Sequence, residues 1–341
     1  MKGGTDLKVG LQALVRYTPQ EVLTKDMFTY LQSVLNALPQ EKREAFSIVP
    51  DEVRRYNGRP GGRACNMAAE VAEAALEQSG LKPEDIDYVL GAEVSIHKAL
   101  GLKKDVPMLN IADCCASLLD QLQIAWMLVE SGEAKHVLVV ASAALAAGGE
   151  PWNTTDPTDP ISPNFGDGAA ACIVSSENLK CEFLAFDSAI DGRAYHSACG
   201  DVSPLRNPDL AEAAGITWTH GPFFRMDDIT YIKVATEEGY LADSLKRMCE
   251  AGGIEPSEIN ALICHHLGDC EAAWKRDLAS VAGSDAAFMN LRLKYGNTGH
   301  TDIPMDLLDF LGRGVVGSGS NIVLWVPGSG ASLAGILLRW Y

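Results

Sequence analysis

Short apolar runs alternate with helical segments along the first half of the chain. Residues 86–91 and 136–141 are apolar stretches bounded by polar or glycine residues, which predicts short strands. Between them, residues 116–130 are apolar on almost every face, which predicts a buried central helix. An earlier segment, residues 65–78, is rich in Ala and Glu and is predicted to form an amphipathic helix. Strands that alternate with helices indicate an α/β fold.

The second half of the chain repeats this order. Residues 229–251 are predicted to form one long helix that ends at a Gly-Gly pair. The next segment, Ile-Glu-Pro-Ser-Glu-Ile-Asn at 254–260, leads into an apolar strand at 261–264. In the first half, Leu-Lys-Pro-Glu-Asp-Ile-Asp at 81–87 leads into a strand in the same way. The two strand entries therefore match in residue type and in place.

A second internal match supports a duplication. Residues 166–174 resemble residues 328–337, and each segment carries a Gly-x-Gly turn after a strand rich in Val and Leu. Two matches in the same order indicate internal duplication. We predict two halves, residues 1–176 and 177–341. Residues 147–164, rich in Gly, Pro, Asp and Thr, are predicted to form a loop.

The composition narrows the class of protein. The 341 residues carry 28 basic and 45 acidic side chains, a net charge of −17, and no Lys/Arg block appears. A nucleic-acid partner is therefore not expected. No apolar run approaches the roughly 18 residues of a membrane-spanning helix, and the start lacks the apolar stretch of a signal peptide. We expect a soluble cytoplasmic protein without a membrane partner.

The cysteines give little support to a metal site. The nine Cys residues include no Cys-x-x-Cys pair, so zinc binding is not predicted. A chain of this length does not need disulfides, and most of the thiols are predicted to be reduced and buried. Neither a metal nor another cofactor is predicted.

One cysteine pair is a candidate for nucleophilic chemistry. Cys115 lies where a strand-like run, residues 107–111, turns into the predicted central helix. The positive end of a helix dipole and its free N–H groups favour a thiolate, which is the form that a cysteine nucleophile needs. The neighbouring Cys114 has nearly the same position. These arguments alone do not choose between the two.

Two further segments carry candidate polar groups. His265 and His266 follow the apolar strand 261–264, where a histidine is either structural or catalytic. Asn297 lies in a Gly-Asn-Thr-Gly segment, which by itself indicates a turn. Each feature alone is weak evidence for a catalytic site, so the interpretation depends on their order along the chain.

In the order Cys, His, Asn, these positions resemble the ketoacyl synthase III (3-oxoacyl-acyl-carrier-protein synthase III) family of the thiolase superfamily. The resemblance covers roughly residues 60–341. Five segments carry it: Asn110-Ile111-Ala112-Asp113-Cys114-Cys115-Ala116-Ser117, Phe165-Gly166-Asp167-Gly168-Ala169-Ala170, Ile263-Cys264-His265-His266, Tyr295-Gly296-Asn297-Thr298 followed by Ile303-Pro304, and Gly328-Ser329-Gly330. Related enzymes of the ketoacyl synthase I/II type use Cys and two His, so Asn297 argues against them.

The resemblance implies a catalytic triad of Cys115, His265 and Asn297. Cys115 would take an acyl group from a thioester, with the backbone N–H groups of Cys115 and Ser329 as the oxyanion hole. His265 and Asn297 would then stabilise the enolate formed by decarboxylation of a malonyl-type thioester. The resemblance implies no metal or other cofactor.

The resemblance also implies a fold and partners. The fold is the duplicated, five-layered αβαβα thiolase fold, with two mixed sheets around buried central helices. The first half would carry the nucleophilic Cys and the second the His and Asn. Acyl-CoA or acyl-carrier-protein thioesters are the implied substrates, in fatty-acid-like or polyketide secondary metabolism. A homodimer is implied, and a shortened segment between residues 94 and 109 leaves room for a heterodimer.

Several positions depart from the family pattern: Asp113, Cys114, Ser117, Leu118, Pro160 and Cys270. A carboxylate at Asp113 disfavours a neighbouring thiolate unless it is paired or points away. Cys270 occupies a position often basic for carrier docking, for which Lys275 and Arg276 are candidate substitutes. These departures indicate a specialised member of the family.

Two alternatives stay open at this point. The same triad could pass the acyl group to an alcohol or amine without decarboxylation, which would make the protein an ester- or amide-forming acyltransferase. It could also be a scaffold subunit without activity, although retention of the whole triad argues against this. His266, His300 and Asp302 are interpreted as solvent-facing or supporting residues and are left out of the catalytic set.

Overall fold

The computed structural model describes residues 7–22, 36, 55–56, 63–91, 95–145, 166–194, 198–201, 223–226, 228–267, 270–328 and 332–341. The predicted loop at 147–164 and the proposed oxyanion residue Ser329 lie outside these residues. Within them, no helix is both long and apolar enough to cross a membrane.

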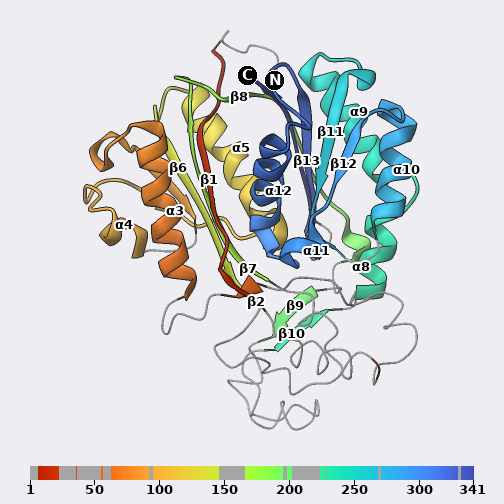
Figure 1. Ribbon diagram of the computed structural model, residues 1–341, viewed down its shortest axis with the longest axis horizontal. Coiled ribbons are helices and arrows are strands. Elements are labelled where there is room, and N and C mark those ends of the chain that lie inside the picture. The colour runs from red at the N-terminus through yellow and green to blue at the C-terminus, as the bar shows by residue number, and fades with distance from the viewer. Residues whose placement is uncertain are drawn as a thin grey trace.

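Two five-stranded mixed arrays form the centre of the fold (Figure 1). The array of the first half runs in the order β1 (Gly10–Tyr17), β7 (Asp167–Ser175), β6 (Val137–Ala144), β4 (Tyr88–Gly91) and β5 (Met108–Leu109). The array of the second half runs in the order β8 (Cys181–Ile190), β14 (Ser332–Trp340), β13 (Asn321–Gly328), β11 (Ile259–Cys264) and β12 (Ala287–Met289). In both arrays the first three strands pair antiparallel and the last three pair parallel.

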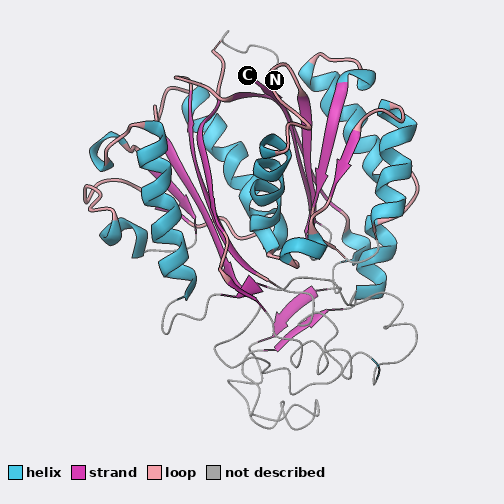
Figure 2. Ribbon diagram, in the orientation of Figure 1, coloured by secondary structure: helices cyan, strands magenta, loops and turns pink. Residues whose placement is uncertain are grey.

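The arrays are joined at one end only. β1 and β8 pair antiparallel at Gly10 with Glu182 and at Leu11 with Cys181, which links all ten strands into one hydrogen-bonded sheet. Away from this seam the arrays diverge and enclose two helices (Figure 2). The seam thus closes one end of a central layer.

The helices complete the five layers. The central helices are α5 (Ser117–Glu130) and α12 (Asp302–Gly312), with α11 (Arg292–Tyr295) beside them. The outer layers are α3 (Arg63–Ser79) with α4 (Ser95–Ala99) on one side, and α8 (Asp228–Ala235), α9 (Tyr240–Gly252) and α10 (Glu271–Ala282) on the other. Short ladders also form between β2 (Glu21–Val22) and β3 (Arg55–Tyr56), and between β9 (Ala198–Asp201) and β10 (Phe223–Met226). The predicted α/β class and layered architecture are confirmed.

The matched strand entries have the same local structure. Each forms a 3-10 turn with Pro at its start, at Pro83–Asp85 and at Pro256–Glu258. The Asp85 carboxylate accepts the Lys82 N–H at 2.8 Å, and the Glu258 carboxylate accepts the Glu255 N–H at 2.7 Å. These turns feed β4 and β11, which hold corresponding places in the two arrays.

One predicted element is wrong in extent. The single helix expected over 229–251 is two helices, α8 and α9, separated by residues 236–239. Gly239 has φ 84°, a left-handed conformation that interrupts an α-helix and that glycine adopts at little cost. The apolar periodicity continues across the break, so the pattern alone did not reveal it.

Both halves contribute to one central core. Leu118, Leu119 and Leu122 of α5 pack with Ile263 of β11 and Leu324 of β13 in one buried cluster. Trp126 of α5 also stacks on Phe186 of β8, with ring centroids 5.0 Å apart and an interplanar angle of 17°. These contacts fix α5 against the second array, and thereby fix the helix end that carries the cysteine pair.

Candidate functional site

The cysteine pair lies in a tight turn at the start of the first central helix. The 3-10 turn η2 (Cys114–Ala116) runs directly into α5. Cys114 is exposed and has φ 45°, whereas Cys115 is half-buried and packs against the central core. The Ser117 hydroxyl accepts the Asp113 N–H at 2.8 Å and donates to the Cys114 carbonyl at 2.6 Å. This side chain therefore braces the turn that presents Cys115.

The last residue of β13, Gly328, lies against the cysteine turn. A Cβ added to Gly328 would sit 3.2 Å from the Ala116 Cβ and 3.3 Å from the Asp113 carbonyl oxygen. The same Cβ would lie 2.3 Å from the Ser332 Oγ, so a larger residue at this position would have to displace that side chain and press on the cysteine turn. The chain after Gly328 leads to Ser329, whose own placement lies outside the described residues.

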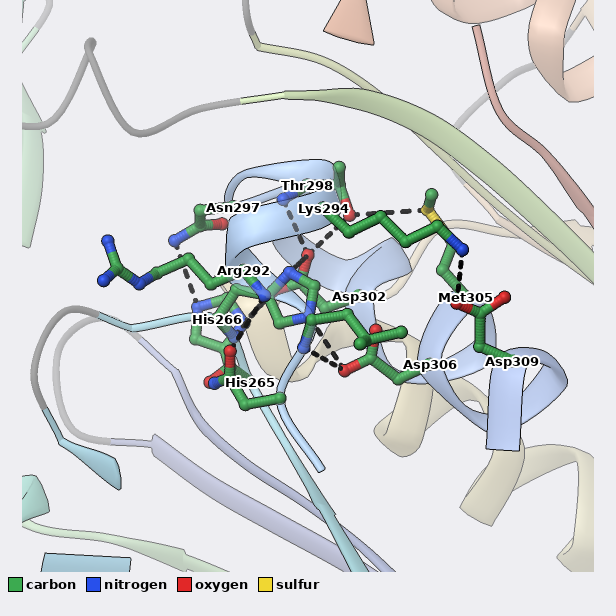
Figure 3. A network of polar contacts seen from close by, with 12 residues as sticks. His265, His266, Arg292, Lys294, Asn297, Thr298, Asp302, Met305, Asp306 and Asp309 are labelled. Atoms are coloured by element: carbon green, nitrogen blue, oxygen red, sulfur yellow. Dashed lines mark hydrogen bonds and ion pairs between the residues drawn. The ribbon is translucent and has the colours of Figure 1, made fainter. Parts of the chain in front are cut away.

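His265 and Asn297 come from two loops of the second half and meet beside Cys115. His265 follows β11 and is only 1% exposed, and its Nε2 lies 3.4 Å from Asn297 Nδ2 (Figure 3). The Asn297 Oδ1 accepts the Gly299 N–H at 2.8 Å, which turns the amide nitrogen toward His265. The Asn297 carbonyl accepts the Gly166 N–H at 2.8 Å and so ties this loop to the start of β7.

The thiol that interacts with His265 is that of Cys115. Burial lowers the pKa of His265, but the interactions with Cys115 and with the charge of Asp302 outweigh burial and raise it to about 10. The structure therefore brings together Cys115, His265 and Asn297, the three positions predicted as the triad.

A carboxylate lies on the other side of the His265 ring. Asp302, the first residue of α12, places Oδ2 2.6 Å from His265 Nδ1. The carboxylate approaches away from the axis of the ring N–H, so the contact is best described as an ion pair. Asp302 is fully buried, so of the two expectations, a solvent-facing or a supporting residue, the solvent-facing one is wrong.

His266 extends this buried cluster. Its Nδ1 lies 2.6 Å from the Gly296 carbonyl and 3.2 Å from Asp302 Oδ1, and its Nε2 lies 2.8 Å from Asp306 Oδ2. Burial lowers the pKa of His266, but the two carboxylates outweigh it and raise that pKa well above its usual range. Carboxylates and imidazoles therefore alternate in the order Asp306, His266, Asp302, His265 (Figure 3).

One feature of the sequence is consistent with this buried cluster, namely the spacing of three Asp residues. Asp302, Asp306 and Asp309 recur at helical spacing on a helix whose other buried residues are mostly apolar. Carboxylates on the buried face of a helix require partners. Asp309 has Arg16 at 2.7 Å and Lys294 at 2.6 Å, whereas Asp302 and Asp306 have the two histidines.

A second carboxyl pair lies at the start of α5. Asp120 interacts with Asp113, the residue just before the cysteine turn. Burial, followed by the hydrogen bond and charge of Asp113, raises the pKa of Asp120 to about 7. The Asp113 carboxyl group beside the cysteine turn therefore has a second carboxyl group, Asp120, as a hydrogen-bonding neighbour.

Lys275 and Arg276 of α10, the two candidates for carrier docking, each form an ion pair with an acidic side chain of the same helix. Lys275 lies 3.1 Å from Glu271, and Arg276 lies 3.1 Å from Asp277. Both cationic side chains are about half-exposed, so these pairs are readily screened by solvent and salt. The carrier-docking role proposed for these two residues stays a prediction.

Comparison with known proteins identifies the family. Residues 109–192 match the model of 3-oxoacyl-[acyl-carrier-protein (ACP)] synthase III, and residues 249–340 match the model of its C-terminal part. The β-ketoacyl-[acyl-carrier-protein] synthase III of Aquifex aeolicus is 27% identical over 284 residues, covering 80% of this chain and 83% of the relative. The corresponding protein of Campylobacter curvus is 24% identical over 353 residues, covering 98% of this chain and 97% of the relative.

Solved structures show the same fold. The crystal structure of the priming β-ketosynthase from a polyketide biosynthetic pathway matches with a TM-score of 0.78 at 20% identity, covering 99% of this chain and 98% of that one. Together, the two matched models span more than half of the chain, in the order in which the duplicated halves occur. The chain therefore belongs to the 3-oxoacyl-[acyl-carrier-protein] synthase III family of condensing enzymes, in the thiolase superfamily.

Proposed function

We propose that this protein is an acyl-thioester condensing enzyme that works through an acyl-Cys115 intermediate. The observation that carries the proposal is the convergence of Cys115, His265 and Asn297, with His265 Nε2 and Asn297 Nδ2 only 3.4 Å apart. These three groups come from segments spread over the chain and meet where the two central helices begin. A nucleophile beside a histidine and a fixed amide donor is the minimum that the reaction needs.

The first half-reaction acylates the protein. The Cys115 sulfur attacks the carbonyl carbon of the acyl thioester, and the donor thiolate leaves. The backbone N–H groups of Cys115 and Ser329 are the proposed donors to the tetrahedral oxyanion. The close packing of Gly328 on the cysteine turn supports this role for the next residue.

The second half-reaction forms the new carbon–carbon bond. A malonyl-type thioester loses carbon dioxide, and the electron pair of the broken bond moves onto its thioester oxygen. His265 and Asn297 Nδ2 donate to that enolate oxygen. The carbanion then attacks the acyl carbon, Cys115 leaves as thiolate, and a β-ketoacyl thioester is released.

The test follows both halves by mass. Intact protein is incubated with a panel of acyl thioesters, and then with malonyl thioester while carbon dioxide is measured. We expect a mass gain equal to one acyl group, followed by its loss together with one carbon dioxide per turnover. Protein alkylated beforehand with iodoacetamide is the control. A folded protein that gains no mass with any donor would support the scaffold alternative.

A second candidate is acyl transfer to an alcohol or amine. The contact between Asp302 and His265 Nδ1 favours it, because a carboxylate on one ring nitrogen leaves the other free to act as a base. In that reaction the acyl group leaves Cys115 without malonyl thioester and without carbon dioxide. Loss of the acyl group to hydroxyl or amine acceptors alone would therefore replace the condensation hypothesis.

We further infer the setting of the reaction. Acyl-CoA or acyl-carrier-protein thioesters in the cytoplasm are the proposed donors, for a fatty-acid-like or polyketide product. A homodimer is the proposed assembly, with a heterodimer as the alternative. Sedimentation of the purified protein, alone and with an acyl carrier protein, tests both the assembly and the carrier.

A further inference from the structure

We propose that Asp302 positions His265 and keeps its imidazole charged, so that Cys115 of the free protein is held as a thiolate. The inference rests on the roles of Cys115 and His265 in the proposed function. Asp302 acts through His265 and is a positioning residue, because its carboxylate contacts the far ring nitrogen rather than the thiol.

The carboxylate of Asp302 is held from several directions. Its Oδ2 accepts the backbone N–H of His266 at 2.9 Å and faces His265 Nδ1 at 2.6 Å. Its Oδ1 accepts the backbone N–H of Thr298 at 2.6 Å and also the Thr298 hydroxyl. With 0% exposure it has no solvent to reorient it, so its direction toward His265 is set by the surrounding loops.

These contacts keep Asp302 ionised. Burial raises the pKa of a carboxyl group, but the charges of His266 and His265 hold the pKa of Asp302 well below its usual range. Backbone N–H donors act in the same direction. Asp302 is therefore a fixed negative charge next to His265.

This charge determines where the thiol proton goes. Because Nδ1 faces Asp302, the ring presents Nε2 to Cys115 and Asn297. The Asn297 amide nitrogen is only a donor, so Nε2 is the acceptor available in this group. The S–H bond of Cys115 breaks, its electron pair stays on sulfur, and the proton forms an N–H bond at Nε2. The resulting imidazolium lies between a thiolate and a carboxylate.

Other titratable groups around His265 do not replace Asp302. His266 is itself cationic, and its ring nitrogens face Gly296 and Asp306. Burial lowers the pKa of His300, whose Nε2 contacts the Ser142 carbonyl, so His300 is neutral near pH 7. On the side of Cys115, the nearby carboxyl groups are Asp113 and Asp120, and negative charge on them opposes a thiolate rather than favouring it.

The test is the rate at which iodoacetamide alkylates Cys115 between pH 5 and pH 9, followed by peptide mass mapping to separate Cys115 from Cys114. The wild-type rate is expected to vary little over pH 6–9. In Asp302→Asn, the rate at pH 6 should fall about tenfold or more, and the midpoint of the profile should move up by about 1–2 pH units. An unchanged profile in that variant would overturn the proposal.

Asp309→Asn is the matched control. Asp309 is a buried, ion-paired carboxylate on the same helix, but its partners are Arg16, Lys294 and Arg313. This variant should lose stability and keep the wild-type profile. Since alkylation needs no thioester substrate, its result is independent of whether the condensation reaction is found.

A second measurement needs no change at Asp302. In wild-type protein labelled with ¹⁵N-histidine, the His265 signals are assigned by their loss in His265→Gln and followed from pH 6 to pH 8. Both ring nitrogens should stay protonated throughout, consistent with a pKa raised to about 10. Titration of His265 with a midpoint near the ordinary histidine value of about 6.5 would contradict the proposal.

Discussion

The two central helices occupy corresponding places in the two halves, but their first turns carry different chemistry. α5 begins with a cysteine turn braced by a serine hydroxyl, and its buried side chains carry no charge. α12 begins with Asp302 and buries two more carboxylates, Asp306 and Asp309. Both turns point into one site. The difference indicates that a repeated scaffold can present the proposed nucleophile from one copy and the charged groups proposed to activate it from the other.

Dipole and charge explain how the second helix tolerates its carboxylates. Negative side chains near a helix N-terminus are stabilised by the positive end of the dipole and by free N–H groups. Asp302 accepts two backbone N–H groups, and Asp306 accepts the Leu291 N–H at 3.0 Å. The first helix uses the same positive end differently, since there it faces the thiol of Cys115.

Removing the thiol of Cys115, the proposed nucleophile, should have the largest effect on activity. Cys115→Ala should reduce acyl-enzyme formation by at least about 10⁴-fold, because no other group takes over the covalent step. Cys114→Ala should keep the rate within about threefold, since Cys114 is exposed and is not the thiol that interacts with His265. Intact mass after a short incubation with an acyl thioester measures both. If Cys114→Ala lost acyl-enzyme formation and Cys115→Ala kept it, the nucleophile would be Cys114 instead of Cys115.

A change in the second half should separate the two reaction steps. Asn297→Ala removes the amide donor while leaving the thiol and His265, so acylation should change less than about tenfold. Decarboxylation should fall about 10²–10³-fold, the usual loss for one oxyanion donor. Single-turnover measurements of acyl transfer and carbon dioxide release test this. Equal losses in both steps would mean that Asn297 acts mainly by holding His265 in place.

The seam between the halves gives a stability prediction. A Cβ at Gly10 would lie 1.8 Å from the Cys181 carbonyl oxygen, so Gly10→Ala must push β1 away from β8. We expect a loss of about 1–3 kcal/mol in the free energy of unfolding, measured with urea. Gly312→Ala, where the added methyl group meets no atom within 4 Å, is the control and should cost nothing. A tolerated Gly10→Ala would show that the seam is loosely held.

The smallest expected effect concerns the carboxyl pair beside the cysteine turn. The folded protein holds the Asp120 proton up to pH of about 7, whereas the unfolded chain loses it near pH 4. Stability therefore falls as pH rises between these values, because the folded state binds more protons there. Asp120→Asn should raise the melting temperature by about 1–3 °C at pH 8 and by less at pH 4, since this half-buried site is partly screened. A gain that is larger at pH 4 would contradict a raised pKa of Asp120.

Much of the fold was accessible from the sequence, because its signals are local. The apolar run at 116–130 and the two Pro-led strand entries each specify structure within a few residues, and all three appear where expected. The break at 236–239 was missed, since a single glycine within a periodic pattern is only a weak signal for the end of a helix.

The candidate site likewise contains residues that the sequence identifies and one residue whose role only the structure shows. Cys115, His265 and Asn297 were found through motifs, and the structure brings them together. The role of Asp302 was not found, because it depends on a pairing across 36 residues between Asp302 and the segment after β11. The helical spacing of Asp302, Asp306 and Asp309 indicates that these carboxylates need partners, but it does not identify His265 as one of them.

The shared central core has a consequence for the synthesis of the chain. α5 is covered by residues of β8, β11 and β13, and the inner face of the first array is contacted by α12, all of which are translated later. At about 5–20 residues per second, the second half takes on the order of 10–30 s to emerge from the ribosome. During that interval the nascent first half exposes a broad apolar surface that only its own continuation can cover. Dependence on a holding chaperone during translation is therefore expected from the architecture itself, independently of the reaction that the finished protein catalyses.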